Sequence, residues 1–336
     1  MKSPLLSLQD VQHARARIAD GLRLTPCAVS SPLSAIAGMT LYPKRDYEQA
    51  TGSFKERGAR NALLTLTPQQ REAGVIAASA GNHALGLAFH GRALGVAVVV
   101  VMPHTAPQVK VQRCRELGAK VVLHGQTFAE THEHALCLSA EYSLTFVHPF
   151  DDPAVIAGQG TVALEVLEQC PDLDALVVPV GGGGLLAGAA VALKALRPEV
   201  ELIGVEPAHA PSFAVALDAG RPLRVPVSPS LADGLSVSTV GLHTFALAQS
   251  LVDRVVTVTE DELAGAMLTL AETDGVVVEG AGAAALAACL SGKLTHLRGR
   301  RVAIILGGRN IDPATHARAL ARARHERDLL SLPKAI

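Results

Sequence analysis

Seven short runs of apolar and β-branched residues, separated by longer stretches of helical pattern, constrain the fold of this chain most. Each run is apolar on both faces of the two-residue strand period, as expected where helices cover both sides of a parallel sheet. Glycines after the helical stretches, as in Leu94-Gly95 and Leu117-Gly118, support this alternation because glycine often ends a helix. The sequence therefore predicts an α/β protein with strands at residues 75–77, 96–101, 119–123, 176–180, 202–205, 255–258 and 302–306.

Local signals add detail to this pattern. Ser7 with Asp10, and Thr67 with Gln70, have the spacing that caps the first turn of a helix, so we expect helices to begin there. The proline-rich stretch 211–237 predicts an irregular loop that could close over a site. Arginines near the C-terminus predict the solvated face of a terminal helix: Arg318, Arg322, Arg324 and Arg327.

Composition limits the classes of partner and compartment. The chain has 336 residues, enough for two domains at roughly 150 residues each. Its formal net charge of -1 gives no reason to expect nucleic acid or an anionic membrane as partner. Five scattered cysteines fit neither a disulfide framework nor a zinc knuckle, and the most hydrophobic run, 96–102, is far short of the roughly 20 residues that span a bilayer. We expect a cytoplasmic protein with a small-molecule partner.

Four consecutive glycines, Gly181 to Gly184, directly follow one predicted strand and open an apolar helix that runs to Leu196. Backbone without Cβ atoms lets amides crowd around an anion, and the helix N-terminus adds partial positive charge. The motif predicts a phosphate cradle. Glycines that merely permit tight packing between strand and helix are the alternative interpretation.

The same loop also fits the G-x-G-x-x-A pattern of dinucleotide-binding proteins. Gly182, Gly184 and Ala187 occupy its positions, and Glu206 ends the next strand at the place of the ribose-binding carboxylate. An NAD-dependent oxidoreductase is therefore an alternative, and a second motif is needed to choose between the two functions.

The second motif is Thr51-Gly-Ser-Phe-Lys55-Glu-Arg-Gly58, a lysine after an aromatic residue in a turn that precedes a predicted helix. A partly desolvated lysine amine is nucleophilic enough to form a Schiff base with an aldehyde cofactor. Lys55 is the candidate nucleophile, although a lysine in such a turn is by itself more often a surface residue.

The third motif, Ser79-Ala80-Gly81-Asn82-His83, follows a predicted strand and opens the helix that runs to Leu94. Amides and hydroxyls at a helix N-terminus suit a substrate carboxylate. Simple capping of that helix by Ser79 or Asn82 is the alternative.

The three motifs, together with His148-Pro-Phe-Asp-Asp-Pro-Ala-Val-Ile-Ala-Gly-Gln-Gly-Thr161, resemble the threonine and serine dehydratases in the same order along the chain. These are pyridoxal-phosphate enzymes of the tryptophan-synthase β fold type, and the resemblance covers residues 11–312. It implies two open parallel-sheet α/β domains with the active site between them. It also implies pyridoxal 5'-phosphate as cofactor.

The resemblance implies a role for each motif residue. Lys55 would hold the cofactor and, once released by the substrate amine, remove the α-proton as general base. Cofactor binding is further implied for Phe54 on one ring face, for Gly181, Gly182, Gly183, Gly184 and Leu185 at the phosphate, for Asn82 at the phenolic oxygen, and for Gly234, Glu279 and Gly307 around the ring. The substrate carboxylate is implied to lie against Ser79, Ala80, Gly81, Asn82 and His83.

Three positions depart from the family pattern. Serine racemases carry a serine where this chain has Ala80, and a methyl group cannot move a proton, so we expect little racemisation. The family's cation site pairs the glutamate at Glu206 with an acidic residue at Ser212, so we expect no metal. The side chain that bonds the pyridine nitrogen is missing at Gly307, which leaves that nitrogen to water or Arg309 and favours elimination over reactions that accumulate a carbanion.

We therefore expect a dehydratase that converts an L-β-hydroxy amino acid such as threonine or serine to a 2-oxo acid and ammonia. A large cofactor-binding domain of residues 1–72 and 147–336 and a small mobile domain of residues 73–146 are implied, in a homodimer. Because the sequence ends at residue 336, we expect no C-terminal regulatory domain. A racemase, an NAD-dependent oxidoreductase and a silent cofactor-binding protein remain alternatives.

Overall fold

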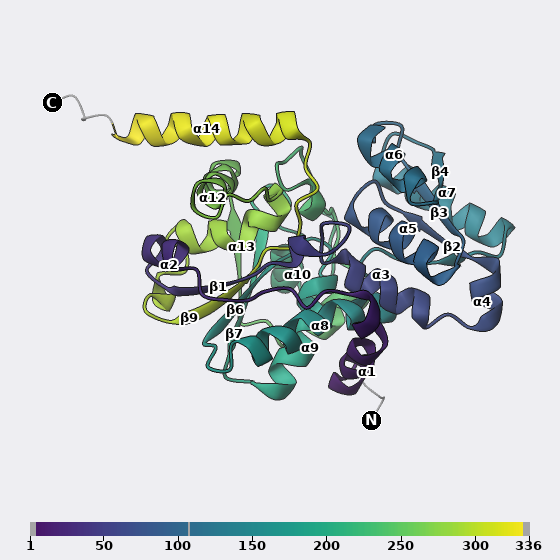
Figure 1. The fold of residues 1–336 in the computed structure, drawn as a ribbon, viewed down its shortest axis with the longest axis horizontal. Helices are drawn as coiled ribbons and strands as arrows, with labels where there is room; N and C mark the ends of the chain where they lie inside the picture. The colour runs from purple at the N-terminus through teal and green to yellow at the C-terminus, as the bar shows by residue number, and fades with distance from the viewer. Residues whose placement is uncertain (1–4, 107, 332–336) are drawn as a thin grey trace.

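The chain folds around two parallel sheets, which a computed structural model describes for residues 5–106 and 108–331 (Figure 1). One sheet has the strand order β1-β9-β6-β7-β8 and the other β4-β3-β2-β5, and every described strand pair is parallel. The strands are β1 (Thr40–Lys44), β2 (Val75–Ala78), β3 (Val98–Met102), β4 (Lys120–Leu123), β5 (Thr145–Phe146), β6 (Ala175–Pro179), β7 (Glu201–Pro207), β8 (Arg254–Val258) and β9 (Arg301–Ile305).

Helices cover the sheets as an α/β chain requires. Figure 1 draws the four-stranded sheet with α4 to α7 at the right, and the larger sheet with its helices at the left. The helices are α1 (Leu8–Ile18), α2 (Ser31–Ala37), α3 (Lys55–Leu64), α4 (Pro68–Ala73), α5 (Asn82–Leu94), α6 (Gln108–Glu116), α7 (Phe128–Glu141), α8 (Pro153–Gln169), α9 (Gly184–Leu196), α10 (Ser212–Ala219), α11 (Leu242–Ala248), α12 (Glu260–Thr273), α13 (Gly280–Leu290) and α14 (Pro313–Ser331).

Both faces of the larger sheet are buried, as its apolar runs predict. Along β6, Leu176 and Val178 point into a core formed with α8 and α9, while Ala175 and Val177 point into a second core formed with α12 and α13. Since successive strand residues face opposite sides, both faces need apolar side chains. The predicted α/β fold class is confirmed.

Two strands were not predicted, and the reason is local. β1 contains Pro43 and Lys44, two residue types that are not typical of a buried strand. The proline is tolerated because β1 is an edge strand. Lys44 is buried as an ion pair with Glu165. β5 has only two residues. The expectation of two apolar faces was also wrong for the edge strands β4 and β8, which are partly exposed.

The expected irregular loop over 211–237 begins instead with the helix α10. Three alanines and a leucine among its eight residues favour a helix, and Gly220 ends it in the left-handed conformation. Glu206 accepts hydrogen bonds from two of its first amides. Prolines therefore mark an irregular segment only after residue 220.

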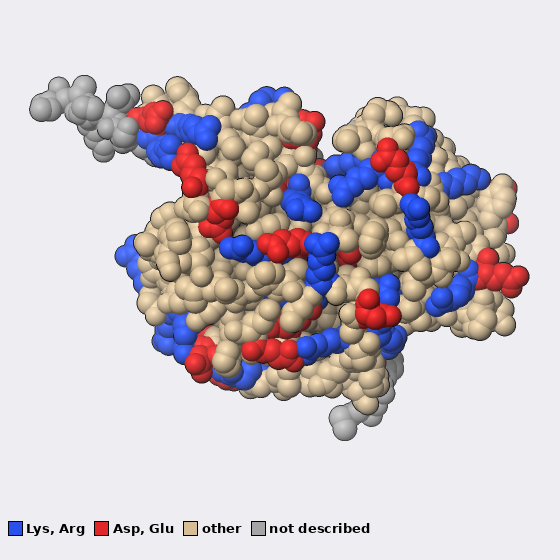
Figure 2. Space-filling view, viewed as in Figure 1, with Lys and Arg blue, Asp and Glu red and all other residues tan. Residues whose placement is uncertain are grey.

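The terminal helix α14 is present and extends along one side of the molecule (Figure 1). Its arginines pair with acidic residues of α12: Arg322 with Asp261, and Arg324 and Arg327 with Glu272. Figure 2 shows basic and acidic side chains interspersed on the face in view. Within residues 5–106 and 108–331, none of the helices is long and apolar enough to cross a bilayer.

Candidate active site

Lys55 begins α3, and its side chain reaches a backbone carbonyl from a distant segment. Nζ donates a hydrogen bond to the Pro149 oxygen at 2.7 Å and lies 5.3 Å from the centre of the Phe54 ring. Burial lowers the pKa of Lys55 to about 8, because removing water disfavours the ammonium form. More of this lysine is therefore a free amine near neutral pH than of an exposed lysine.

Four helices around Lys55 begin without a side-chain cap. The residues preceding α3, α5, α9 and α13 make no capping hydrogen bond, although Gln159 accepts the Gly58 N–H in the first turn of α3. The residues preceding α10 and α11 make none either, but Glu206 and Asp151 accept first-turn amides there. The preceding side chain caps α1, α2, α4, α7, α8 and α12. The first amides of a helix have no intrahelical acceptor, so an uncapped N-terminus favours anions. This arrangement suits a ligand with phosphate and carboxylate groups.

The glycine loop before α9 is held by close packing. A Cβ on Gly182 or Gly184 would lie 2.3 Å or 2.7 Å from Phe150, and Gly183 has φ +93 and lies against Thr244. The Thr244 hydroxyl donates to the Gly182 oxygen at 2.8 Å. Packing therefore accounts for the glycines themselves, while the uncapped amides at the start of α9 remain available to an anion.

Two further residues predicted at the cofactor lie beside this loop. A Cβ on Gly181 would lie 3.1 Å from Leu235 and 3.3 Å from the Gly234 oxygen, so the Gly234 backbone and the loop are neighbours. The Leu185 side chain packs into the core against α8, which leaves only its backbone available to a ligand.

Asn82, the first residue of α5, is oriented by two side chains distant in sequence. Its Nδ2 donates to Glu279 Oε1 at 2.7 Å, and its Oδ1 accepts from Asn310 Nδ2 at 2.8 Å. The pKa of Glu279 is raised to about 7, mainly by burial and also by the negative charge of Asp233. Sequence reasoning assigned no role to Asn310, although it lies in the same motif as Gly307.

The loop before Asn82 is open where a substrate would need it. The Ser79 hydroxyl accepts the Gly81 N–H at 3.2 Å, and a Cβ on Gly81 would meet nothing within 4 Å. Ala80 is partly buried against the core of the smaller sheet. His83 is buried with its Nε2 at 3.2 Å from the Val147 oxygen, and burial lowers its pKa to about 3, so it is neutral.

Gly307 packs against the Phe54 ring. Its oxygen accepts the Phe54 N–H at 3.0 Å, and a Cβ at Gly307 would lie 3.1 Å from Phe54 Cδ1. A serine at this position would therefore require the ring to shift by a few tenths of an ångström. The absence of a side chain at residue 307 therefore allows Phe54 to lie where it does.

His148, which sequence reasoning quoted without a role, organises the segment that contacts Lys55. Its Nδ1 accepts the backbone N–H of Asp151 at 2.8 Å and of Phe150 at 3.3 Å. These bonds require an unprotonated Nδ1, and burial lowers the pKa of His148 to about 4. Neutral His148 thus holds the turn that presents the Pro149 oxygen to Lys55.

We expect His148→Asn to reduce the acid sensitivity of folding. Histidine in the unfolded chain protonates at about 6.5 but in the fold only at about 4, so its contribution, about 3 kcal/mol in all and about 2 kcal/mol by pH 5, is lost as pH falls between these values. An asparagine oxygen can accept the same two N–H groups without titrating. Urea unfolding near pH 5 and pH 8 measures the difference, with the exposed His104→Asn as control. An unchanged acid loss in His148→Asn would contradict this role.

Glu206 does not form a cation site with Ser212. Both of its carboxylate oxygens accept backbone N–H groups of α10, from Phe213 at 2.7 Å and Ala214 at 2.9 Å, and burial raises its pKa to about 7. The residues present do not fit a divalent cation, which prefers several ionised oxygen ligands. We expect a strong chelator to leave turnover unchanged; turnover lost with chelator and restored by Mg²⁺ would overturn this.

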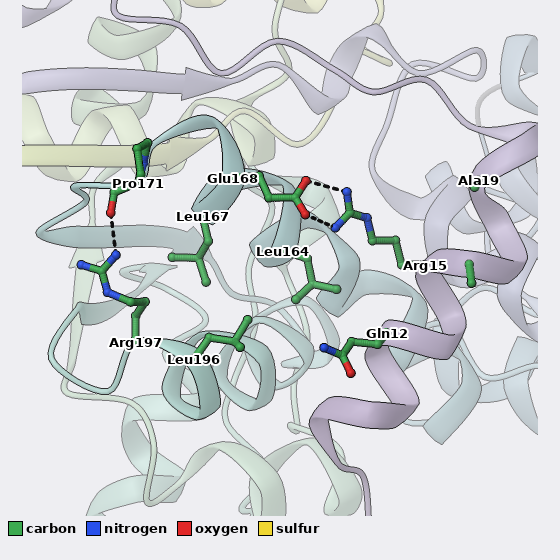
Figure 3. Close-up of a pocket in the computed structure, with 10 residues that line it drawn as sticks. Gln12, Arg15, Ala19, Leu164, Leu167, Glu168, Pro171, Leu196 and Arg197 are labelled. Carbon is green, nitrogen blue, oxygen red and sulfur yellow. Dashed lines mark hydrogen bonds and ion pairs between the residues drawn. The ribbon is translucent and has the colours of Figure 1, made fainter.

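A surface hollow of about 670 Å³ lies elsewhere, between α1 and the ends of α8 and α9 (Figure 3). Arg15 pairs with Glu168 at its rim, and Arg197 donates to the Pro171 oxygen. None of the predicted site residues lines it.

The chain is similar to known enzymes over most of its length. It is 46% identical over 308 residues to an L-threonine ammonia-lyase of Thermotoga maritima, covering 92% of this chain and 76% of that protein. Threonine deaminase isoform 2 from Solanum lycopersicum, in its processed form, superposes with a TM-score of 0.91 at 37% identity, covering 97% of this chain and 90% of that chain. Serine racemase from Dictyostelium discoideum superposes with a TM-score of 0.86 at 36% identity, covering 92% of this chain and 99% of that chain.

Residues 18–308 match the family described as pyridoxal-phosphate dependent enzyme, and the chain belongs to it. The resemblance to this family and the predicted cofactor are confirmed. The NAD-dependent alternative was wrong: besides the family match, the Glu206 oxygens that would bind a ribose are occupied by the amides of α10.

The site residues fit pyridoxal phosphate. A lysine amine of lowered pKa lies among uncapped helix N-termini, and the hydroxyls of Thr51 and Ser53, beside Phe54, are buried without a partner in the described part of the chain. When bound, the cofactor supplies an electron sink that acidifies the substrate Cα–H and lets a β-substituent leave.

Proposed function

We propose that this protein is an ammonia-lyase that converts L-threonine or L-serine to the corresponding 2-oxo acid and ammonia. The observation that carries the proposal is the partly desolvated Lys55 amine, which donates a hydrogen bond to the Pro149 oxygen. The names of the relatives in Thermotoga and Solanum support the same reaction.

The chain's own residues suit this elimination. Lys55 would take the α-proton as general base, since its lowered pKa leaves more of it as free amine near neutral pH than an exposed lysine would have. The amides before α9 would hold the cofactor phosphate, and those of residues 79–82 the substrate carboxylate. Asn82, fixed by Glu279 and Asn310, would hydrogen-bond the ring substituent.

Racemisation is the second candidate, because a serine racemase is among the similar structures. It needs a second proton-transfer group on the face opposite Lys55. Family resemblance assigns that position to Ala80, whose methyl group carries no proton that can be exchanged. We therefore propose that elimination strongly exceeds racemisation.

The proposal is tested with purified protein. We expect a yellow protein that borohydride bleaches with covalent labelling of Lys55, and 2-oxo acid release from one or more of L-threonine, L-serine, 3-hydroxyaspartate and bulkier β-hydroxy amino acids. D-serine formed from L-serine as fast as pyruvate would make the protein a racemase. If none of these substrates releases ammonia, the protein is a silent cofactor-binding protein.

We further propose that residues 73–146 form a small domain that moves over the substrate, relative to residues 1–72 and 147–336. All four strands of the smaller sheet lie in that range. We also propose that the protein is cytoplasmic. We propose that it forms a homodimer, which sedimentation would test.

A further inference from the structure

Two cysteines that are 143 residues apart in sequence meet in the fold. Cys27 lies in the extended segment before α2, and Cys170 directly follows α8. Their Sγ atoms are 3.6 Å apart. Each sulfur also approaches a carbonyl: Cys27 Sγ is 3.7 Å from the Tyr42 oxygen, and Cys170 Sγ is 3.5 Å from the Cys27 oxygen.

The pair is buried but shallow. Exposed fractions are 5% for Cys27 and 3% for Cys170. The chain neighbours on both sides of Cys27 are exposed, as is Pro171 immediately after Cys170. Figure 3 shows Pro171 at the rim of the hollow between α8 and α9. Both cysteines therefore adjoin exposed residues of the chain.

The contact between the two sulfurs makes Cys170 the more acidic thiol of the pair. Its pKa is lowered, first because the Cys27 thiol can donate to it and also because the Lys44 ammonium is near. Lys44 Nζ is held there by the Thr25 oxygen at 2.6 Å and by Gln169 Oε1 at 2.9 Å. By contrast, burial raises the pKa of Cys114 to about 11 and of Cys289 to about 12.

We propose that Cys27 and Cys170 are a peroxide-sensitive modification site that closes to a disulfide. Cys170 thiolate attacks one oxygen of hydrogen peroxide, expels hydroxide and becomes a sulfenic acid. The Cys27 thiol then attacks that sulfur, the S–S bond forms and water leaves. In total, two thiols and one peroxide give one disulfide and two waters. A disulfide length of about 2.05 Å requires each sulfur to move only about 0.8 Å.

The bond would close a loop of 143 residues that contains α3 with Lys55 and the whole four-stranded sheet. Closing so long a loop restricts the unfolded chain strongly. We expect oxidation to raise the melting temperature by roughly 5 °C, reversibly with dithiothreitol. We expect turnover to stay the same, because each sulfur moves little and neither is a hydrogen-bond partner of Lys55 or Pro149.

The experiment uses the holoprotein carrying Cys137→Ser, which removes the exposed thiol that could cross-link copies. Of five cysteines four remain, and after hydrogen peroxide two should titrate in denaturant. Mass spectrometry should find the protein lighter by two hydrogen atoms and one peptide pair joined through Cys27 and Cys170.

Cys289→Ser in the same background is the matched control, since it removes a buried thiol and should leave disulfide formation intact. Cys27→Ser should abolish it and leave oxidation as added oxygen on Cys170. Four thiols that still titrate after peroxide, or a bridge that maps to Cys114 or Cys289, would overturn the proposal. Because mapping in the Cys137→Ser protein decides this alone, the test survives if Cys27→Ser does not fold.

Discussion

Replacing Lys55 with alanine is expected to lower 2-oxo acid formation by at least ~10³-fold, because general acid–base catalysis alone contributes about 10²–10⁴. The variant also loses the amine that would hold the cofactor, and the Pro149 oxygen loses its donor. Lys55→Arg should be similarly inactive, because guanidinium stays protonated and cannot accept the α-proton. Steady-state assays of 2-oxo acid release, with borohydride labelling, measure both losses.

The matched control is Lys120→Ala, which removes an exposed lysine on β4. It should retain full turnover and labelling. If Lys55→Ala kept more than about a tenth of the wild-type rate, the general base of the proposed reaction would have to be another group.

Arg57→Leu is expected to lower the free energy of unfolding by about 3–5 kcal/mol, because it leaves buried carboxylates without their counter-charge. Arg57 has no exposed side-chain surface. Its Nε and Nη2 bind Asp46 at 2.7 Å and 2.9 Å, while Nη1 and Nη2 bind Glu165 at 2.6 Å and 2.8 Å. Lys44 alone then remains to balance two acidic groups.

Urea unfolding of the holoprotein measures this loss, and Arg15→Leu provides the matched control. Arg15 also pairs with a carboxylate through two nitrogens, that of Glu168, but the two side chains are 37% and 57% exposed. An exposed pair is worth at most about 1 kcal/mol. Equal losses in the two variants would mean that the buried cluster does not stabilise α3.

Much of the fold could be predicted from the sequence because its signals are local. Apolar runs located seven of the nine described strands, and capping residues such as Ser7 and Thr67 marked helix starts correctly. β1 was missed because its lysine is buried through partners distant in sequence, among them Glu165 and Gln169 of α8. A residue buried by a distant partner looks like a surface residue in the sequence.

The residues of the site also differ in how far the sequence could predict them. Lys55 and the glycine loop stand in recognisable local motifs, and their surroundings agree with the predicted binding of phosphate and carboxylate. The Pro149 oxygen, the acceptor on His148 and the amide of Asn310 could not be predicted, because each acts through a contact made only by the folded chain. Arg57 likewise gave no sign that it is buried.

The helix N-termini around Lys55 have a consequence for the free protein. A side-chain cap stabilises a helix by about 1 kcal/mol, and α5, α9 and α13 all lack one. Their first turns should therefore exchange amide hydrogens faster than those of the capped α8 and α12 until an anionic ligand accepts their hydrogen bonds. Binding at the site would then increase the rigidity of three separate helix ends, and the fold would reach its full stability only as a complex.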